Sequence, residues 1–222
     1  MTAKTGITTV LATTVVALFS TLLAAPVAAS GATGGSGAPG FLSIWGQTVA
    51  PAPAPKPQSR AGYWEYGSWK VSVERQDSYE DGVYYNCQAW TGGDGEPYAR
   101  VGISSQDVGP PHAYPGVTIE EYAPRGYQTF MQGQQRMYLW FDDEDTYDGI
   151  VESYYDNDGL PNAVVSFYYP YSLPVLLAMR RNNQMDVVVE GRVFHSFFLN
   201  GFTASYLKMM EGCGFSGVGV VH

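Results

Sequence analysis

The sequence predicts a mainly β domain, a β-sandwich or barrel, that ends in a short helix. Many short runs alternate apolar and polar residues, and turns rich in Gly, Asp, Asn and Pro separate them at even spacing. The clearest strand pair consists of two runs, 187–189 and 193–199, divided by Glu190-Gly191. The apolar spacing then changes to the helical period, with apolar side chains at Phe202, Tyr206, Met209, Met210 and Cys213. Asn200 is the expected N-cap of this helix, and Gly212 or Gly214 its expected end.

The preceding elements follow the same rules. A strand is expected around Trp69–Val73, and Asp81-Gly82 is a hairpin signal that leads into a strand with Cys87 on its apolar face. The proline-rich stretch 108–116 must be a loop. Ser172 is expected to cap one further short helix, which ends at the polar run 180–183. The remaining expected strands are 98–103, 117–122, 136–141, 150–155 and 163–169, the last two joined by a turn at 156–159.

Two segments precede this domain. Residues 1–29 combine Lys4, an apolar core and a small-residue end at Ala28-Ala29, which is the layout of a secretory signal peptide; a retained membrane anchor is the alternative. Residues 30–60 are rich in Gly, Ala and Pro and predict a linker. The folded domain is therefore expected at 61–222, in the periplasm or elsewhere in the cell envelope, or secreted.

The sequence carries no catalytic motif. It lacks HExxH, GxSxG and a phosphate-binding glycine loop, and its two cysteines lack the spacing of metal ligands. His195 falls within a strand and is expected to be a packed residue. We therefore expect a non-enzymatic protein with no catalytic residues, no metal site and no cofactor. Because 21 acidic residues oppose 12 basic ones, with a net charge of −9, nucleic acid and anionic membranes are poor partners.

Eight of the acidic residues lie between Asp142 and Asp158, a stretch without Lys or Arg. A hard cation such as Ca²⁺ binds several carboxylate and carbonyl oxygens, so a cation site in loops 142–158 is one hypothesis. The EF-hand spacing is absent. The alternative is a solvated acidic loop that keeps the protein soluble.

Aromatic residues suggest a binding surface. The chain holds 17 Tyr and five Trp. Tyr84 and Trp90 lie on the strand face opposite Cys87, and Tyr138 and Trp140 share a face of another strand. Such side chains can stack on sugar rings or receive a protein partner. Coverage by a partner sheet is the alternative.

Several stretches resemble the invasion-associated locus B family of exported bacterial proteins. They are the tryptophan strand 67–71, Cys87, Leu177-Ala178-Met179-Arg180-Arg181 running into 185–189, and the ending Phe197-Phe198-Leu199-Asn200-Gly201-Phe202-Thr203-Ala204-Ser205-Tyr206 closed by Cys213. Phe198 departs from the family pattern, which has a small polar residue there. The resemblance implies an immunoglobulin-like β-sandwich in the envelope of a Gram-negative bacterium, and it brings no catalytic motif.

The two cysteines are expected to form a disulfide. An exported chain enters an oxidising compartment, and both Cys87 and Cys213 are expected to face the same core. Two buried free thiols are the alternative reading.

Three functions are consistent with these patterns. The first is an envelope interaction module that binds an envelope or host protein, or a glycan, through its aromatic face or loops. The second is a cation- or glycan-binding β-sandwich that uses loops 142–158. The third is a hydrolase whose triad is assembled from distant residues.

Overall fold

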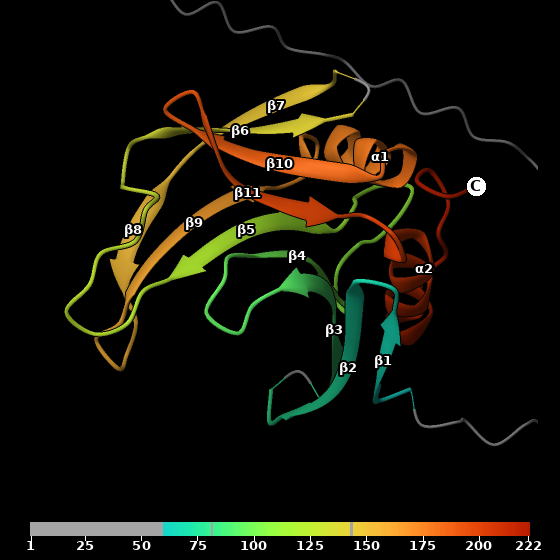
Figure 1. Cartoon of the computed structure of the whole chain (residues 1–222). Helices are drawn as coiled ribbons and strands as arrows, with labels where there is room; N and C mark the ends of the chain where they lie inside the picture. Colours follow the sequence, from blue (N-terminus) through green and yellow to red (C-terminus); the bar gives the residue numbers. More distant parts are fainter. Residues whose placement is uncertain (1–59, 81, 143) are drawn as a thin grey trace, which may run out of the picture. The chain divides into compact units, whose positions relative to one another are not determined.

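A computed structural model describes residues 60–80, 82–142 and 144–222 of the protein (Figure 1). The predicted signal peptide and all of the predicted linker except Arg60 lie outside these residues. In the described part of the chain, the strands form two antiparallel sheets and two helices complete the fold. The prediction of a mainly β sandwich with two short helices is therefore confirmed.

The larger sheet has seven strands in the order β1-β2-β3-β4-β5-β9-β8. Its first five strands form a meander, in which each strand pairs with the next one along the chain. The predicted β8–β9 hairpin is present at the far edge. The strands are β1 (Gly62–Tyr66), β2 (Trp69–Ser78), β3 (Gly82–Gly92), β4 (Tyr98–Ser104), β5 (Gly116–Tyr122), β8 (Glu152–Tyr155) and β9 (Pro161–Phe167).

The smaller sheet has four strands in the order β11-β10-β6-β7, with bounds β6 (Arg136–Phe141), β7 (Thr146–Ile150), β10 (Gln184–Val189) and β11 (Arg192–Phe198). Glu190 and Gly191 join β10 to β11, and both have positive φ, 52° and 74°. Two consecutive residues with positive φ are typical of the tight turns that match the twist of a hairpin. The strand pair predicted from this dipeptide is confirmed.

The core lies between the inward faces of the two sheets. Alternate residues of the larger sheet are fully buried, among them Val71, Ala89, Val101 and Ile119. The smaller sheet contributes Met137, Leu139, Met185, Val187 and Phe197. This period of two is what a half-buried strand requires, since one face packs on the core and the other faces solvent.

Helix α2 (Phe202–Cys213) covers the core side of β1 to β4 (Figure 1). Phe202, Tyr206, Met209 and Met210 are all at most 1% exposed, so the predicted apolar stripe faces the core. The helix ends at Gly214, which has φ 84° and is one of the two predicted stop residues. Cys213 in the last turn forms a disulfide with Cys87 of β3, and the two Cα atoms are 5.9 Å apart. The predicted pairing is confirmed.

The starts of both helices differ from the sequence prediction. Asn200 is not the N-cap of α2; Gly201 occupies that position with φ 94°, and a Cβ there would meet the Tyr66 carbonyl oxygen at 1.8 Å. Asn200 instead accepts a hydrogen bond from Ser68 at 2.6 Å. In helix α1 (Ser172–Arg181), Tyr171 occupies the N-cap position without a side-chain cap, so Ser172 is the first helical residue and not the cap.

Two strand predictions are also corrected. Strand β1 was not predicted, because it is short and no residue in it is fully buried; its exposed face carries Tyr63 and Glu65. The predicted strand 150–155 is divided at Val151, where the chain passes from β7 in the smaller sheet to β8 in the larger one. Val151 is fully buried and exchanges backbone hydrogen bonds with 134–135, so it anchors the crossing between the sheets.

The immunoglobulin-like arrangement that the family resemblance implies is not confirmed by this sheet order. Among the described residues, neither helix has the length and the apolar composition that crossing a membrane requires.

Candidate functional site

The outer face of the larger sheet carries polar and aromatic side chains. The strand register aligns them in rows that cross the sheet. One row runs from Lys70 through Trp90 and Arg100 to Thr118, and the next from Ser72 through Gln88 to Gly102 and Gly116. The second row therefore ends in two facing glycines, where the sheet has no side chains to cover it.

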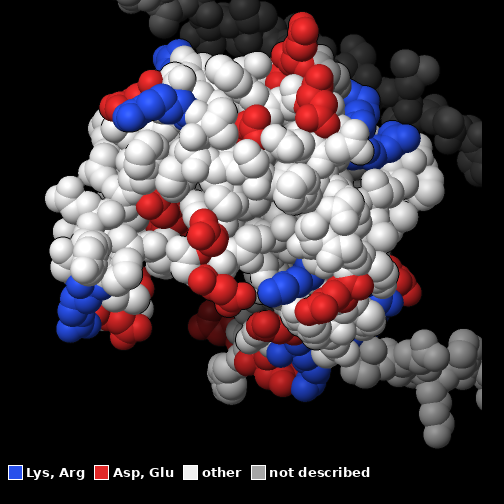
Figure 2. All heavy atoms as spheres, in the orientation of Figure 1, with Lys and Arg blue, Asp and Glu red and all other residues white. Residues whose placement is uncertain are grey.

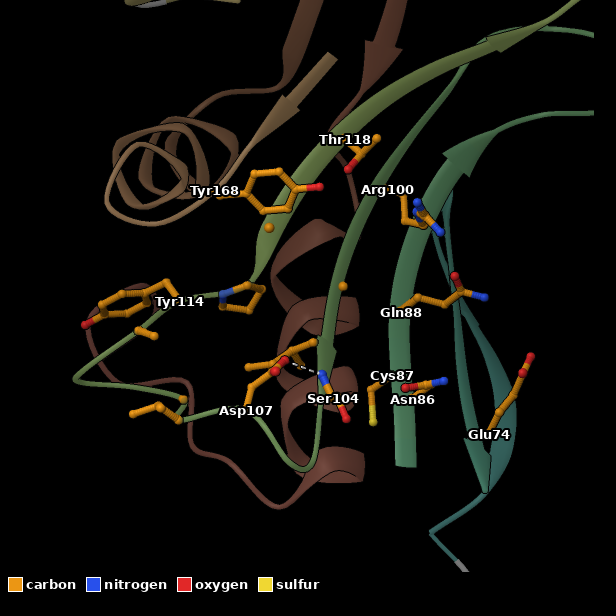
Figure 3. Close-up of a pocket in the computed structure, with 17 residues that line it drawn as sticks. Glu74, Asn86, Cys87, Gln88, Arg100, Ser104, Asp107, Tyr114, Thr118 and Tyr168 are labelled. Atoms are coloured by element: carbon orange, nitrogen blue, oxygen red, sulfur yellow. Dashed lines mark hydrogen bonds between the residues drawn. The ribbon is translucent and has the colours of Figure 1, made fainter. Parts of the chain in front are cut away.

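A groove lies over these glycines, with a cavity volume of about 710 Å³ (Figure 3). This volume falls within the usual range for small-molecule sites, roughly 300–1,000 Å³. Strands β2 to β5 form its floor, the loop between β4 and β5 forms one wall, and Tyr168 after β9 adds to that wall. The lining side chains whose chemistry bears on binding are Glu74, Asn86, Gln88, Arg100, Ser104, Asp107, Tyr114, Thr118 and Tyr168.

The two glycines make the floor of the groove. Gly102 lies in the middle of β4, and a Cβ there would meet no atom nearer than the Cys87 carbonyl oxygen at 3.8 Å. A Cβ on Gly116 would lie 3.4 Å from the Tyr168 ring, so this ring covers Gly116. Glycine weakens the interior of a strand, and it often marks a place where another group approaches the backbone closely. The groove is therefore open over Gly102, whereas the Tyr168 ring closes the space over Gly116.

The polar side chains of the groove lie on neighbouring rows of the sheet. Gln88 Nε2 donates to Ser72 Oγ at 3.1 Å across β2 and β3. Asn86 is exposed on the next row, opposite Ser104. In Figure 3 the hydroxyl of Tyr168 points toward Thr118, while Arg100, Gln88 and Asn86 lie on the other side of the space. The groove thus presents hydroxyl and amide groups across from an aromatic ring.

The wall formed by the β4–β5 loop is supported from within. The Asp107 carboxylate accepts a hydrogen bond from the backbone N–H of Ser104 at 2.7 Å. The rings of Tyr114 and Tyr169 are 5.8 Å apart, and Tyr114 also contacts Gly219 near the C-terminus. Its hydroxyl points away from the groove (Figure 3). The proline-rich loop predicted at 108–116 is therefore an ordered wall of the site.

A buried carboxylate borders the groove. The Glu120 side chain is 5% exposed and accepts hydrogen bonds from the hydroxyls of Tyr98 at 2.5 Å and Tyr122 at 2.8 Å. A guanidinium nitrogen of Arg100 is 3.7 Å from the same carboxylate. Burial and the bond to Glu120 raise the pKa of Tyr98 far above its usual value. The pKa of Tyr154, which also contacts Glu120, is raised mainly by burial. This cluster fixes Arg100 at the edge of the groove.

The four aromatic residues of the predicted binding surface do not come together. Tyr84 and Trp90 are half-buried on the outer face of the larger sheet, beside the groove residues of β3. Tyr138 and Trp140 lie on β6, on the outer face of the smaller sheet, and Trp140 is 44% exposed. They therefore belong to two separate surfaces. Trp90 extends the groove face toward Tyr63, whose ring centroid is 5.9 Å away.

Several carboxylates of the acidic segment have structural partners. Asp142 accepts the backbone N–H groups of Asn183 and Gln184, at 2.9 and 3.1 Å, where α1 leads into β10. Asp145 forms an ion pair with Arg181. Figure 2 shows acidic side chains gathered around the β6–β7 turn, with basic ones beside them.

The remaining part of the acidic segment is strand and turn. Asp148 in β7 is 3.6 Å from Arg136, and Asp156 accepts two backbone N–H groups in the turn before β9. Among the described residues, no three His, Cys, Asp or Glu side chains come close enough together to hold a metal ion. Asp143 lies outside the described residues. Asp142 and Asp156 thus organise the turns in which they lie.

His195 lies on β11, and its ring is 4.5 Å from the ring of Phe197. Burial lowers its pKa, and the nearby Glu96 carboxylate, 3.7 Å away, acts in the opposite direction. Partial burial against Phe197 is consistent with the packing role that the sequence predicts.

Comparisons with known proteins do not assign a function to the groove. No family model, curated protein or solved structure matches the chain.

The sequence prediction missed the groove. Its signal was present in part, since Gly102 interrupts an otherwise regular strand and Gly116 opens the next one. Their alignment depends on the β4–β5 register, which the sequence alone does not reveal.

Proposed function

We propose that this chain is a non-catalytic binding protein of the cell envelope, of the invasion-associated locus B type, and that its ligand site is the groove over Gly102 and Gly116. The signal peptide predicted in residues 1–29 and the family resemblance support the compartment. The groove itself carries the proposal of binding. A mid-strand glycine with open space above it leaves an exposed backbone floor, which costs stability and is useful where a ligand approaches.

The groove favours binding over catalysis because of the residues that line it. Its charged groups are Glu74, Asp107 and Arg100, and no histidine, cysteine thiol or lysine lies beside them in the lining. Asp107 already accepts a backbone N–H, and Arg100 is near Glu120. The Arg100 guanidinium stays protonated and the Asp107 carboxylate holds the loop backbone, whereas the amide and hydroxyl groups of the lining suit recognition.

The test compares the intact chain with Gly102→Leu. Because a Cβ at residue 102 has room, the leucine should fill the groove without disturbing the strand. Both proteins, immobilised, are exposed to total envelope material, and the retained proteins, peptides and glycans are identified by mass spectrometry. A component retained by the wild type and lost with Gly102→Leu supports the proposal. Identical sets of retained components, with both proteins folded by circular dichroism, would refute it.

Export has its own test. Mass spectrometry of the protein from the envelope or the medium should show a mature chain that lacks residues 1–29. An intact Met1 in that material would make the chain membrane-anchored and overturn this part of the proposal.

A further inference from the structure

The position of the groove limits what its ligand can be. It lies on a sheet face whose strand backbones already pair with their neighbours from β2 to β5. An extended peptide that adds to a sheet does so at an edge, where backbone groups are free. A ligand in this groove must therefore be recognised by side chains.

Four of the side chains that line the groove are neutral donors and acceptors. Asn86 and Gln88 carry amides, which both donate and accept, and Thr118 and Ser104 carry hydroxyls. Gln88 is held by its bond to Ser72, so its amide has a fixed orientation. Groups of this kind match a ligand that carries many hydroxyls.

Tyr168 supplies a flat apolar surface that points toward Thr118 and lies across the groove from Asn86 and Gln88 (Figure 3). Its side chain is 69% exposed, although its ring rests against Gly116 at 3.4 Å from the position of a Cβ. The ring is thus supported on one side and accessible on the other. An aromatic ring beside amide and hydroxyl groups suits a sugar, whose ring has apolar C–H faces and a polar rim.

The charges at the groove argue against an acidic ligand. Glu74 and Asp107 contribute two negative charges to the lining, and Arg100 contributes one positive charge. Arg100 is further offset by Glu120, 3.7 Å away. The field in the groove therefore repels anions, including uronic acids and phosphorylated sugars.

From these observations we infer that the groove binds a neutral oligosaccharide. Tyr168 is the stacking surface, and the amides of Asn86 and Gln88 form hydrogen bonds with the hydroxyl groups of the sugar. The inference rests on the proposed function, since it names the class of ligand for the same groove.

The experiment uses isothermal titration calorimetry of the intact chain with three neutral hexasaccharides, namely maltohexaose, cellohexaose and chitohexaose. An oligogalacturonate of the same length is the acidic comparison. At least one neutral sugar should bind, and oligogalacturonate should bind more weakly. Tyr168→Ala should weaken binding about three- to tenfold, as expected for loss of one aromatic contact. Tyr168→Phe keeps the ring and should change affinity by less than about twofold.

Three further variants test whether binding occurs in the groove or elsewhere on the surface. Tyr127 is 70% exposed, almost the same as Tyr168, but does not line the groove, so Tyr127→Ala is a matched control that should bind normally. Gly102→Ala should weaken binding and Gly102→Leu should abolish it. Both should melt within a few degrees of the wild type.

The outcomes distinguish the two proposals. Sugar binding that is lost with Gly102→Leu and weakened by Tyr168→Ala supports both. Preference for oligogalacturonate, or retention of an envelope protein or peptide but of no sugar, refutes the oligosaccharide; if Gly102→Leu abolishes that binding, the groove remains the ligand site. Sugar binding unchanged by Gly102→Leu and Tyr168→Ala places the site elsewhere and refutes both. The absence of binding to every sugar and every envelope component also refutes both.

Discussion

The disulfide between Cys87 and Cys213 should be the largest single contribution to the stability of the folded domain. It joins residues 126 positions apart, the end of α2 to the third strand of the larger sheet. A cross-link restricts the unfolded chain, and for a loop of this length the entropy corresponds to about 5 kcal/mol at 25 °C. Domains of this size are stable by about 5–15 kcal/mol, so the bond accounts for a large part of the total.

The perturbation is the double variant Cys87→Ala and Cys213→Ala, which removes the bond without leaving a buried thiol. A loss of about 5 kcal/mol should lower the melting temperature by about 10–20 °C, at 2–4 °C per kcal/mol for a domain of this size. Thermal unfolding followed by circular dichroism measures this shift. Reductant should lower the melting temperature of the wild type by a similar amount.

The double variant also supplies the control, because reductant should leave its melting temperature unchanged. Helix α2 should remain folded at low temperature, since its contacts with the core do not depend on the bond: Phe202, Tyr206, Met209 and Met210 are all buried. Equal melting temperatures for the wild type and the double variant would refute the reasoning. Labelling of both thiols in the folded, unreduced wild type would refute the bond itself.

Three further predictions concern individual side chains. Trp69→Phe removes a fully buried indole that donates to the Phe198 carbonyl at 3.1 Å, and should cost about 2–4 kcal/mol of unfolding free energy in urea titrations. Tyr98→Phe removes a bond to the buried Glu120 carboxylate and should cost about 1.5–3 kcal/mol at neutral pH. Because the pKa of Tyr98 is raised from 10.0, its contribution is complete below pH 10 and is lost as the pH rises further; the variant should therefore lose stability less steeply above pH 10. Asp142→Ala removes the acceptor of two exposed backbone N–H groups, which water can then solvate, and should cost about 0.5–1.5 kcal/mol equally with and without Ca²⁺. Calorimetry of the wild type should show no Ca²⁺ binding tighter than about millimolar.

Features that depend on neighbours in the sequence were predicted well. The β10–β11 turn follows from Glu190-Gly191, and the end of α2 follows from Gly214, because each depends on a local backbone conformation. The disulfide was predicted because two cysteines in a chain with a predicted export signal have one possible intramolecular pairing, and both positions were expected on apolar faces.

Features that depend on contacts between residues far apart in the sequence were not predicted. The start of α2 is set by the Tyr66 carbonyl, which lies so close to Gly201 that no side chain fits there, and the sequence prediction chose Asn200 by its capping propensity alone. The division at Val151 depends on which sheet each half joins. An alternating pattern shows that a residue is buried but not which sheet buries it.

The same distinction explains why the groove was missed while its neighbours were identified. Tyr84 and Trp90 stand on the correct face of β3, because the face of a strand follows from alternation with Cys87. The floor of the groove forms where Gly102 lies opposite Gly116. This pairing depends on the register between β4 and β5. A shift by one residue would exchange the two faces of β5 and bring Val117 into the groove. The buried Val117 and Ile119 prevent that shift, because the core requires them on its side. The packing of the core therefore determines the alignment of the glycines, and through it the existence of the candidate binding site.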